Sequence, residues 1–261
     1  MTVAPHRTAA EWSLPDVALV VGAGLFASSV AGALVVLSLG AGLTILTFSL
    51  LFAAQTLGSL AAMWVLSERK GTGDLVADYG LAVHGADLWA IFLGIGLQIG
   101  ISILLAPLLF RLFPDGPPEQ AVAALAGQAR GAIEIVLVFV SVVVVAPIVE
   151  EMIYRKMLLD RLRRSFGTAP AVLGSAAIFA LIHLMDPNAI AVVPGLFVVG
   201  IVLGVLAVRR GDLSLAILTH AGVNLTGVVL LLWGDRMLEY LQRLAEQAEQ
   251  AAIVVGRLTG G

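Results

Sequence analysis

Long apolar runs separated by short polar segments dominate the pattern of this 261-residue chain. A helix needs roughly 20 predominantly apolar residues to cross a membrane. The pattern predicts seven spans, at residues 17–38, 41–66, 88–110, 132–153, 169–185, 189–208 and 214–233. The fourth helix is expected to continue to about Arg164, because no helix breaker precedes Gly167. The predicted fold class is therefore all-α, a polytopic transmembrane helical bundle.

Two segments outside these spans are expected to be helical as well. The mixed stretch between the second and third spans predicts a surface loop with a short interfacial helix, in which His84 is solvated. Residues 236–255 carry apolar side chains at helical spacing. They predict an amphipathic C-terminal helix that lies on the membrane surface or on the bundle itself.

Composition supports a membrane protein and excludes several other classes. The chain is 59% hydrophobic and 13% charged, whereas a soluble domain carries roughly a quarter charged residues. The absence of cysteine excludes disulfides, thiolate nucleophiles, cysteine zinc sites and iron–sulfur clusters. With a net charge of -3 and no basic tract, nucleic acid is not an expected partner.

The distribution of lysine and arginine predicts the orientation. Most of these residues fall on the side that holds the N-terminus, and they are densest in the segment 155–164. Because cytoplasmic loops are enriched in lysine and arginine, the N-terminus is expected in the cytoplasm. We expect an integral protein of the plasma (inner) membrane.

The first of three polar clusters is Glu150-Glu151-Met152-Ile153-Tyr154-Arg155, directly after an apolar run. Glu151 and Arg155 are one helical turn apart and can form an ion pair. Glu150 is then left without its own cation, and such a carboxylate can act as a base. Pro147 is expected to free the carbonyl of Val143 and to kink the helix, which makes room beside it.

The second and third clusters lie on the fifth and seventh predicted spans. Phe179 and His183 share one helix face, as do His220 and Asn224. A lone histidine in an apolar helix is more often packed than catalytic. However, Glu150 lies 17 residues before Gly167 and His183 lies 16 residues after it. At about 1.5 Å per residue, the two reach a similar depth on neighbouring helices.

His220 and Asn224 can hold an oxyanion through side-chain N–H groups or contribute ligands to a metal. The chain lacks a His-Glu-x-x-His pair, a Gly-x-Ser-x-Gly elbow and a glycine-rich phosphate loop. These absences disfavour a metalloprotease of the His-Glu-x-x-His type, a serine hydrolase and a nucleotide-binding enzyme.

In this order, the three clusters resemble the motifs of the CAAX-protease and bacteriocin-processing (CPBP or Abi) family of intramembrane endopeptidases, also called type II CAAX prenyl endopeptidases. The family pattern is Glu-Glu-x-x-x-Arg, then Phe-x-x-x-His, then His-x-x-x-Asn or His-x-x-x-Asp. Lys156 stands where relatives often have glycine. The resemblance predicts a catalytic core at 130–233, preceded by N-terminal helices and loops at 1–129 and followed by an amphipathic tail at 234–261, within a single membrane domain.

The resemblance also implies roles for the motif residues. Glu150 would activate water with the help of His183, His220 and Asn224 would stabilise the oxyanion, and Glu151, Arg155 and Phe179 would support the site. The family has been described both as glutamate-type and as metal-dependent. In the second case Glu150, His183, His220 and Asn224 would hold a divalent metal such as zinc. The sequence leaves this choice open.

The predicted function is therefore an intramembrane endopeptidase. It would hydrolyse a membrane-associated or lipid-modified peptide or protein near the cytoplasmic face or within the bilayer, with membrane lipid as its other partner. One alternative is a non-catalytic scaffold or bacteriocin-immunity protein of the same fold. A proton-coupled transporter is a weaker alternative, because the polar residues gather in the second half and no repeat is visible.

Overall fold

The structure is a computed structural model that describes residues 10–40, 42, 44–129 and 131–259. The described chain is helical and contains no strand. Seven helical segments within it are long and apolar enough to cross a membrane: Leu14–Ser38, Ile45–Lys70, Gly85–Leu112, Ala132–Phe166, Thr168–Met185, Val193–Arg210 and Ser214–Gly234. The predicted all-α polytopic bundle is confirmed, and so is the continuation of the fourth helix to about Arg164, since it ends at Phe166.

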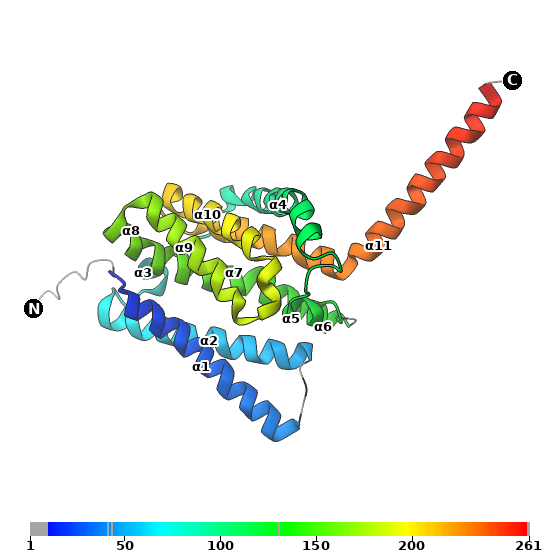
Figure 1. The fold of residues 1–261 in the computed structure, drawn as a ribbon. Helices are drawn as coiled ribbons and strands as arrows, with labels where there is room; N and C mark the ends of the chain where they lie inside the picture. The colour runs from blue at the N-terminus through cyan, green and yellow to red at the C-terminus, as the bar shows by residue number, and fades with distance from the viewer. Residues whose placement is uncertain (1–9, 41, 43, 130, 260–261) are drawn as a thin grey trace, which may run out of the picture.

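The elements follow one another with short connections (Figure 1). The first half contains α1 (Leu14–Leu39), α2 (Ile45–Lys70), α3 (Leu75–Tyr79), the 3-10 turn η1 (Gly85–Asp87), α4 (Ala90–Leu112) and α5 (Ala121–Ala126). The fourth span is one continuous helix made of α6 (Ala132–Phe139), η2 (Val140–Val145), α7 (Ala146–Glu151), η3 (Met152–Leu159) and α8 (Asp160–Phe166). The remaining elements are α9 (Thr168–Ile182), the 3-10 turns η4 (His183–Met185) and η5 (Pro187–Ala191), α10 (Val193–Arg210) and α11 (Ser214–Thr259).

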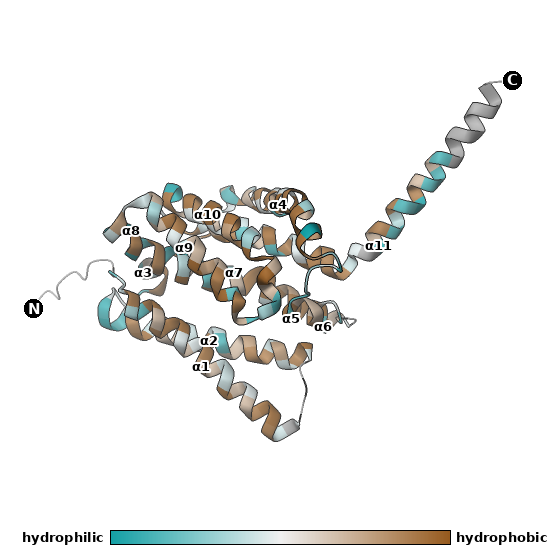
Figure 2. Cartoon of the chain, in the orientation of Figure 1, coloured by the Kyte–Doolittle hydropathy of each residue, from teal (hydrophilic) through white to brown (hydrophobic). Residues whose placement is uncertain are grey.

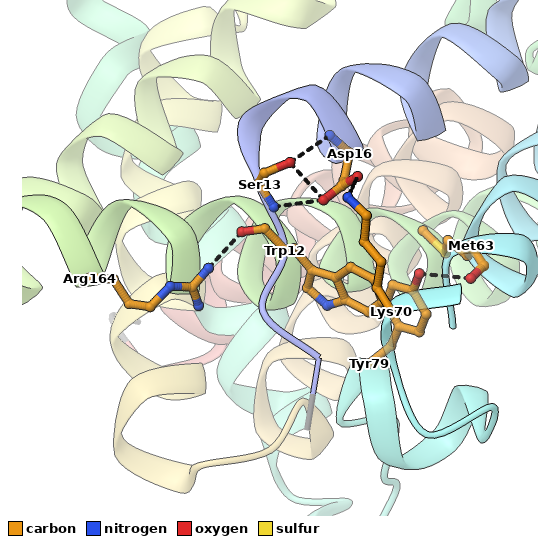
Figure 3. A network of polar contacts seen from close by, with 7 residues as sticks. All are labelled: Trp12, Ser13, Asp16, Met63, Lys70, Tyr79 and Arg164. Atoms are coloured by element: carbon orange, nitrogen blue, oxygen red, sulfur yellow. Dashed lines mark hydrogen bonds and ion pairs between the residues drawn. The ribbon is translucent and has the colours of Figure 1, made fainter. Parts of the chain in front are cut away.

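The start of α1 is tied to three other elements at one end of the bundle. Ser13 and Asp16 form a capping box, in which each side chain accepts a backbone N–H of the other residue. Figure 3 shows this network of Trp12, Ser13, Asp16, Met63, Lys70, Tyr79 and Arg164. Lys70 at the end of α2 lies 2.6 Å from Asp16, and Arg164 of α8 donates to the carbonyl of Trp12. The indole of Trp12 stacks on Tyr79 of α3, with ring centroids 4.8 Å apart.

A buried carboxylate holds α3 in place beside this network. Asp78 is only 1% exposed and accepts hydrogen bonds from the hydroxyl of Ser67 and from the backbone N–H and hydroxyl of Thr72. Burial alone would raise the pKa of Asp78, but these hydrogen bonds outweigh it and hold the pKa below its ordinary value. The short helix predicted between the second and third spans is present as α3, and its interfacial position stays a prediction. His84 is about half exposed, and its Nε2 lies 3.0 Å from Asp212.

Glycines bring α4 and α11 into close backbone contact. A Cβ at Gly94 would collide with the carbonyl of Thr219, and a Cβ at Gly222 would collide with the carbonyl of Ile91. Small residues at helix interfaces allow this close approach in membrane bundles. The contact fixes the helix that carries His220 and Asn224 against α4.

The last helix differs from the sequence prediction. α11 continues without a break for 46 residues, and Figure 1 shows its second half projecting away from the bundle. Figure 2 shows that hydrophilic positions recur along this projecting part, whereas the bundle helices are mainly hydrophobic. Residues 236–249 are exposed there, so for these residues the alternative of packing on the bundle is wrong. Their expected place on the membrane surface stays a prediction.

Candidate active site

The fourth span contains two π-helical segments, η2 and η3, on either side of the short helix α7. α7 carries Glu150 and Glu151. Segments with π register are rare in proteins and are frequent at functional sites. The two adjacent carboxylates thus lie on the one α-helical turn between two irregular stretches.

The π register of η2 creates a hydrogen-bond acceptor that α11 uses. The N–H of Ala146 donates to the carbonyl of Ser141, five residues back. Pro147 follows and has no N–H, so in the same register the carbonyl of Val142 lacks its partner. The Nδ2 of Asn224 donates to this carbonyl at 2.8 Å. From α-helical spacing the sequence predicts a free carbonyl at Val143, which stays a prediction; the π register leaves the carbonyl of Val142 for Asn224.

Glu151 has two partners inside the bundle. Its Oε2 lies 3.2 Å from Nε of Arg155, and neither side chain is exposed. Its Oε1 lies 2.9 Å from Nδ1 of His220. The predicted pairing of Glu151 with Arg155 is confirmed. The contact with His220 was not predicted, because residues 69 positions apart show no spacing that would reveal it.

Glu150 has a different environment from its neighbour. Its side chain is 30% exposed, and its Oε2 lies 3.7 Å from Nε2 of His220. The imidazole of His220, itself almost fully buried, therefore lies between the two carboxylates. One carboxylate is sealed in the core and the other borders open space.

His183 is oriented by its own helix. Its Nδ1 lies 2.8 Å from the carbonyl oxygen of Phe179. Because a carbonyl can only accept, Nδ1 carries the hydrogen of this bond and Nε2 of the neutral ring is left as an acceptor.

Phe179 is fully buried at the centre of the three motifs. Its ring meets the rings of His183 and His220 edge to face, at centroid distances of 5.2 and 5.7 Å. The guanidinium carbon of Arg155 lies 4.7 Å from the same centroid, within the range of a cation–π contact. Phe179 thus packs against one residue from each polar cluster.

Two cavities meet at these residues. The larger, about 500 Å³, is lined by Glu150, Phe179, His183, His220 and Asn224 together with many apolar side chains. The smaller, about 310 Å³, lies between α1, α2 and the end of α9, and it is also lined by Glu150 and His183. The structure therefore brings the four predicted chemical residues to one cavity. Gln98 and Gln120 line it too; nothing in their sequence spacing marks them.

The predicted metal ligands are Glu150, His183, His220 and Asn224. Across the described residues, no three His, Asp or Glu side chains gather closely enough to hold a metal ion. The Nδ1 of His220 is engaged by Glu151 and the Nδ2 of Asn224 by Val142. These contacts leave Nε2 of His220 and Oδ1 of Asn224 as the atoms that could ligate a metal, because a metal-bound histidine commonly donates its other ring N–H to a carboxylate. The divalent metal stays a prediction.

The chain is a polytopic helical bundle in which carboxylates and imidazoles converge on an internal cavity. It is therefore an integral membrane protein with ionisable residues at membrane depth, and such residues usually mark function. Residues 132–226 match the model of a family described as type II CAAX prenyl endopeptidase Rce1-like. The matched segment contains all three clusters, so the core is similar to this family and the predicted resemblance is confirmed. No curated protein and no solved structure matches the chain.

Proposed function

We propose that the protein is an intramembrane endopeptidase of glutamate type, in which Glu150 activates the attacking water. The family match supports a membrane protease in general terms. The observation that carries the finer proposal is a row of contacts from the core to the cavity: Arg155 to Glu151, Glu151 to His220, and His220 to Glu150. Only the last member of this row borders the cavity with a substantially exposed side chain.

We propose that His220 is protonated in this row, because its charge would balance the others. Glu150 and Glu151 carry two negative charges, and Arg155 supplies one positive charge. Uncompensated charge is costly in a medium of low dielectric constant. With His220 protonated, the four groups sum to zero, and both ring nitrogens donate. Nδ1 then serves Glu151, and Nε2 presents an N–H beside Glu150.

Hydrolysis follows from these positions. Glu150 takes a proton from water while the water oxygen bonds to the carbonyl carbon of the peptide, and the carbonyl oxygen becomes an oxyanion. The N–H at Nε2 of His220 and the second N–H of the Asn224 amide stabilise this charge. The intermediate then breaks its C–N bond, and Glu150 returns the proton to the leaving nitrogen. The free Nε2 of His183 accepts a hydrogen bond from the water and orients it.

The two cavities favour an endopeptidase over an exopeptidase. They extend from Glu150 and His183 in two directions, one toward α4 and α11 and the other toward α1 and α2. A substrate can therefore continue on both sides of the bond that is cut. The proposed substrate is a membrane-associated peptide or protein, with lipid-modified ones included.

The test compares new N-termini in membranes of cells that express the wild type, Glu150→Gln or Glu119→Gln. Glu119 is an exposed carboxylate outside both cavities and gives a matched control for the loss of charge. We expect Glu150→Gln to lose cleavage by about 10²–10⁴-fold, the usual contribution of a general base, while Glu119→Gln keeps it. Cleavage that persists in Glu150→Gln would exclude the proposal. A cellular phenotype that survives the same change would favour the scaffold or immunity function.

Metal content separates the two catalytic types. A metal-dependent enzyme would contain stoichiometric zinc or another divalent ion when purified, and His220→Ala would lose it. The glutamate-type proposal predicts no stoichiometric metal in either protein. Elemental analysis of both, together with activity after chelation, decides between them.

A further inference from the structure

The projecting part of α11 presents an apolar stripe that stays exposed. Residues 236–249 are all exposed. The large apolar and aromatic side chains among them are 42–63% exposed, and they are Met237, Leu238, Tyr240, Leu241 and Leu244. Contiguous exposed apolar surface of this kind usually marks an interaction site.

The spacing of the stripe is that of a coiled coil. In such a helix the positions a and d of each heptad abcdefg are apolar and pack against the same positions of another helix. Starting from a d position, the sequence places at successive d and a positions Met237, Leu241, Leu244, Ala248, Ala251 and Val255. The stripe therefore has the repeat that a second helix needs for packing along its length.

The charges of this segment lie on the face opposite the stripe. In the same heptad frame, the charged residues between positions 236 and 249 occupy only b, c and f, and they are Arg236, Glu239, Arg243, Glu246 and Glu249. The e and g positions that flank the stripe are uncharged over the same range, and they hold Leu238, Tyr240, Ala245 and Gln247. Because like charges that face one another weaken an interface, a stripe without charge is compatible with a second copy of itself.

A lipid surface fits the stripe less well than a second copy does. Helices that lie on membranes are rich in lysine and arginine on the polar face and carry tryptophan or phenylalanine on the apolar face. The polar face of residues 236–249 instead holds more glutamate than arginine, and no tryptophan or phenylalanine follows Trp233.

The membrane span favours the second copy further. α11 runs unbroken from Ser214 to Thr259, so the stripe is continuous with the seventh span. Two copies inserted in one membrane have the same orientation, and their stripes therefore begin at the same depth. This is the arrangement that a parallel, in-register pair of helices requires.

We infer that residues 237–255 of α11 pair with the same residues of a second copy of this chain, as a parallel coiled coil that joins two bundles in the membrane. The contact is isologous, because the same stripe serves both copies about a two-fold axis. The inference does not rest on the proposed function, since pairing of the tails requires no catalysis.

The chain contains no cysteine, so single cysteines report the pairing without further changes. Leu244→Cys lies at a d position of the stripe, and Glu246→Cys lies at an exposed f position on the opposite face. Each full-length variant is oxidised with copper phenanthroline in membranes, and the fraction of disulfide-linked dimer is measured. We expect cross-linking of Leu244→Cys and little of Glu246→Cys, because only d positions of the two helices approach closely enough for a disulfide. Equal cross-linking of both variants, or none of either, would overturn the inference.

A second charge change tests whether the stripe itself drives the pairing. In the Leu244→Cys protein, Leu241→Glu places a charge on the stripe, whereas Gln242→Glu places the same charge on the opposite face. We expect the first change to abolish cross-linking and the second to keep it. Cross-linking that survives Leu241→Glu would contradict the coiled coil.

A spin-labelled lipid detects the alternative, a helix that lies on the membrane. Leu244→Cys and Glu246→Cys, each carrying a fluorophore, are placed in liposomes of phosphatidylethanolamine and phosphatidylglycerol that contain a headgroup-labelled nitroxide lipid. We expect quenching at Leu244→Cys to be no stronger than at Glu246→Cys. Stronger quenching at Leu244→Cys would show that lipid covers the stripe and would exclude pairing.

Discussion

The chain offers two ion pairs with the same residue types and spacing in opposite surroundings. Glu151 and Arg155 are one turn apart and fully buried, with 3.2 Å between Oε2 and Nε. Glu239 and Arg243 are also one turn apart, on the projecting part of α11, and their side chains are 64% and 74% exposed. We predict that Glu151→Gln and Arg155→Met destabilise the protein, whereas Glu239→Gln and Arg243→Met do not.

The distance between the two buried charges sets the magnitude of the expected destabilisation. Two unit charges 3.2 Å apart attract each other by about 5 kcal/mol at an effective dielectric constant of ~20. Removing one partner leaves the other charge buried, which costs about 3–5 kcal/mol. Glutamine keeps an oxygen that can accept from Nδ1 of His220, so Glu151→Gln removes mainly the charge. An exposed pair contributes about 0.2–1 kcal/mol at most.

The assay is a double-mutant cycle for each pair, with reversible unfolding in mixed detergent micelles followed by tryptophan fluorescence. We expect a coupling energy of about 1–3 kcal/mol between Glu151 and Arg155, and one near zero between Glu239 and Arg243. Single-mutant effects that add to within about 0.5 kcal/mol for the buried pair would refute the reasoning, because independent sites behave in that way.

Three further changes test other parts of the bundle. Gly94→Ala should destabilise the protein by about 1–3 kcal/mol, because the new Cβ collides with the backbone of α11. Gly96→Ala is the control and should not destabilise it, because a Cβ there meets nothing within 4 Å. Thermal unfolding in detergent measures both variants. Asn224→Leu leaves the carbonyl of Val142 in η2 unpaired and should cost about 1–3 kcal/mol of stability. Adding Pro147→Ala restores a backbone N–H and should recover part of the lost stability. If the double variant recovers none of it, the π register is contradicted. The pKa of Asp78 is lowered from its ordinary 3.8, so its contribution to stability is complete above that value and is lost as pH falls through the lower folded pKa. The wild type should therefore lose stability on acidification below about pH 4 more steeply than Asp78→Asn, and identical slopes would contradict the assignment.

The sequence predicts the spans well because hydropathy alone determines them. Each of the seven helices carries a window of high mean hydropathy with at most two charged residues. The tail was predicted less well. Its amphipathic spacing is compatible with several positions, and the exposure of residues 236–249 decides against packing on the bundle.

The site was predictable in its residue types but not in its connections. The depth argument for Glu150 and His183 needed only a helical rise and a turn at Gly167, and both residues line the same two cavities. The contact of His220 with Glu151 depends on how α11 is rotated against α7. The acceptor at Val142 depends on the π register, and an uninterrupted run of apolar residues from Ile135 to Val140 gives no signal of where that register begins.

The π segments also affect how relatives of this chain should be aligned. A hydrogen bond that reaches back five residues instead of four accommodates one extra residue in the helix. A relative with one valine fewer in the run from Val142 to Val145 would keep every motif letter and a full-length apolar span. Val138 would nevertheless be turned by roughly 100° relative to Glu150, and the carbonyl facing Pro147 would change. Deletion of one valine, rather than substitution of any motif residue, would then separate relatives that share this site geometry from those that do not.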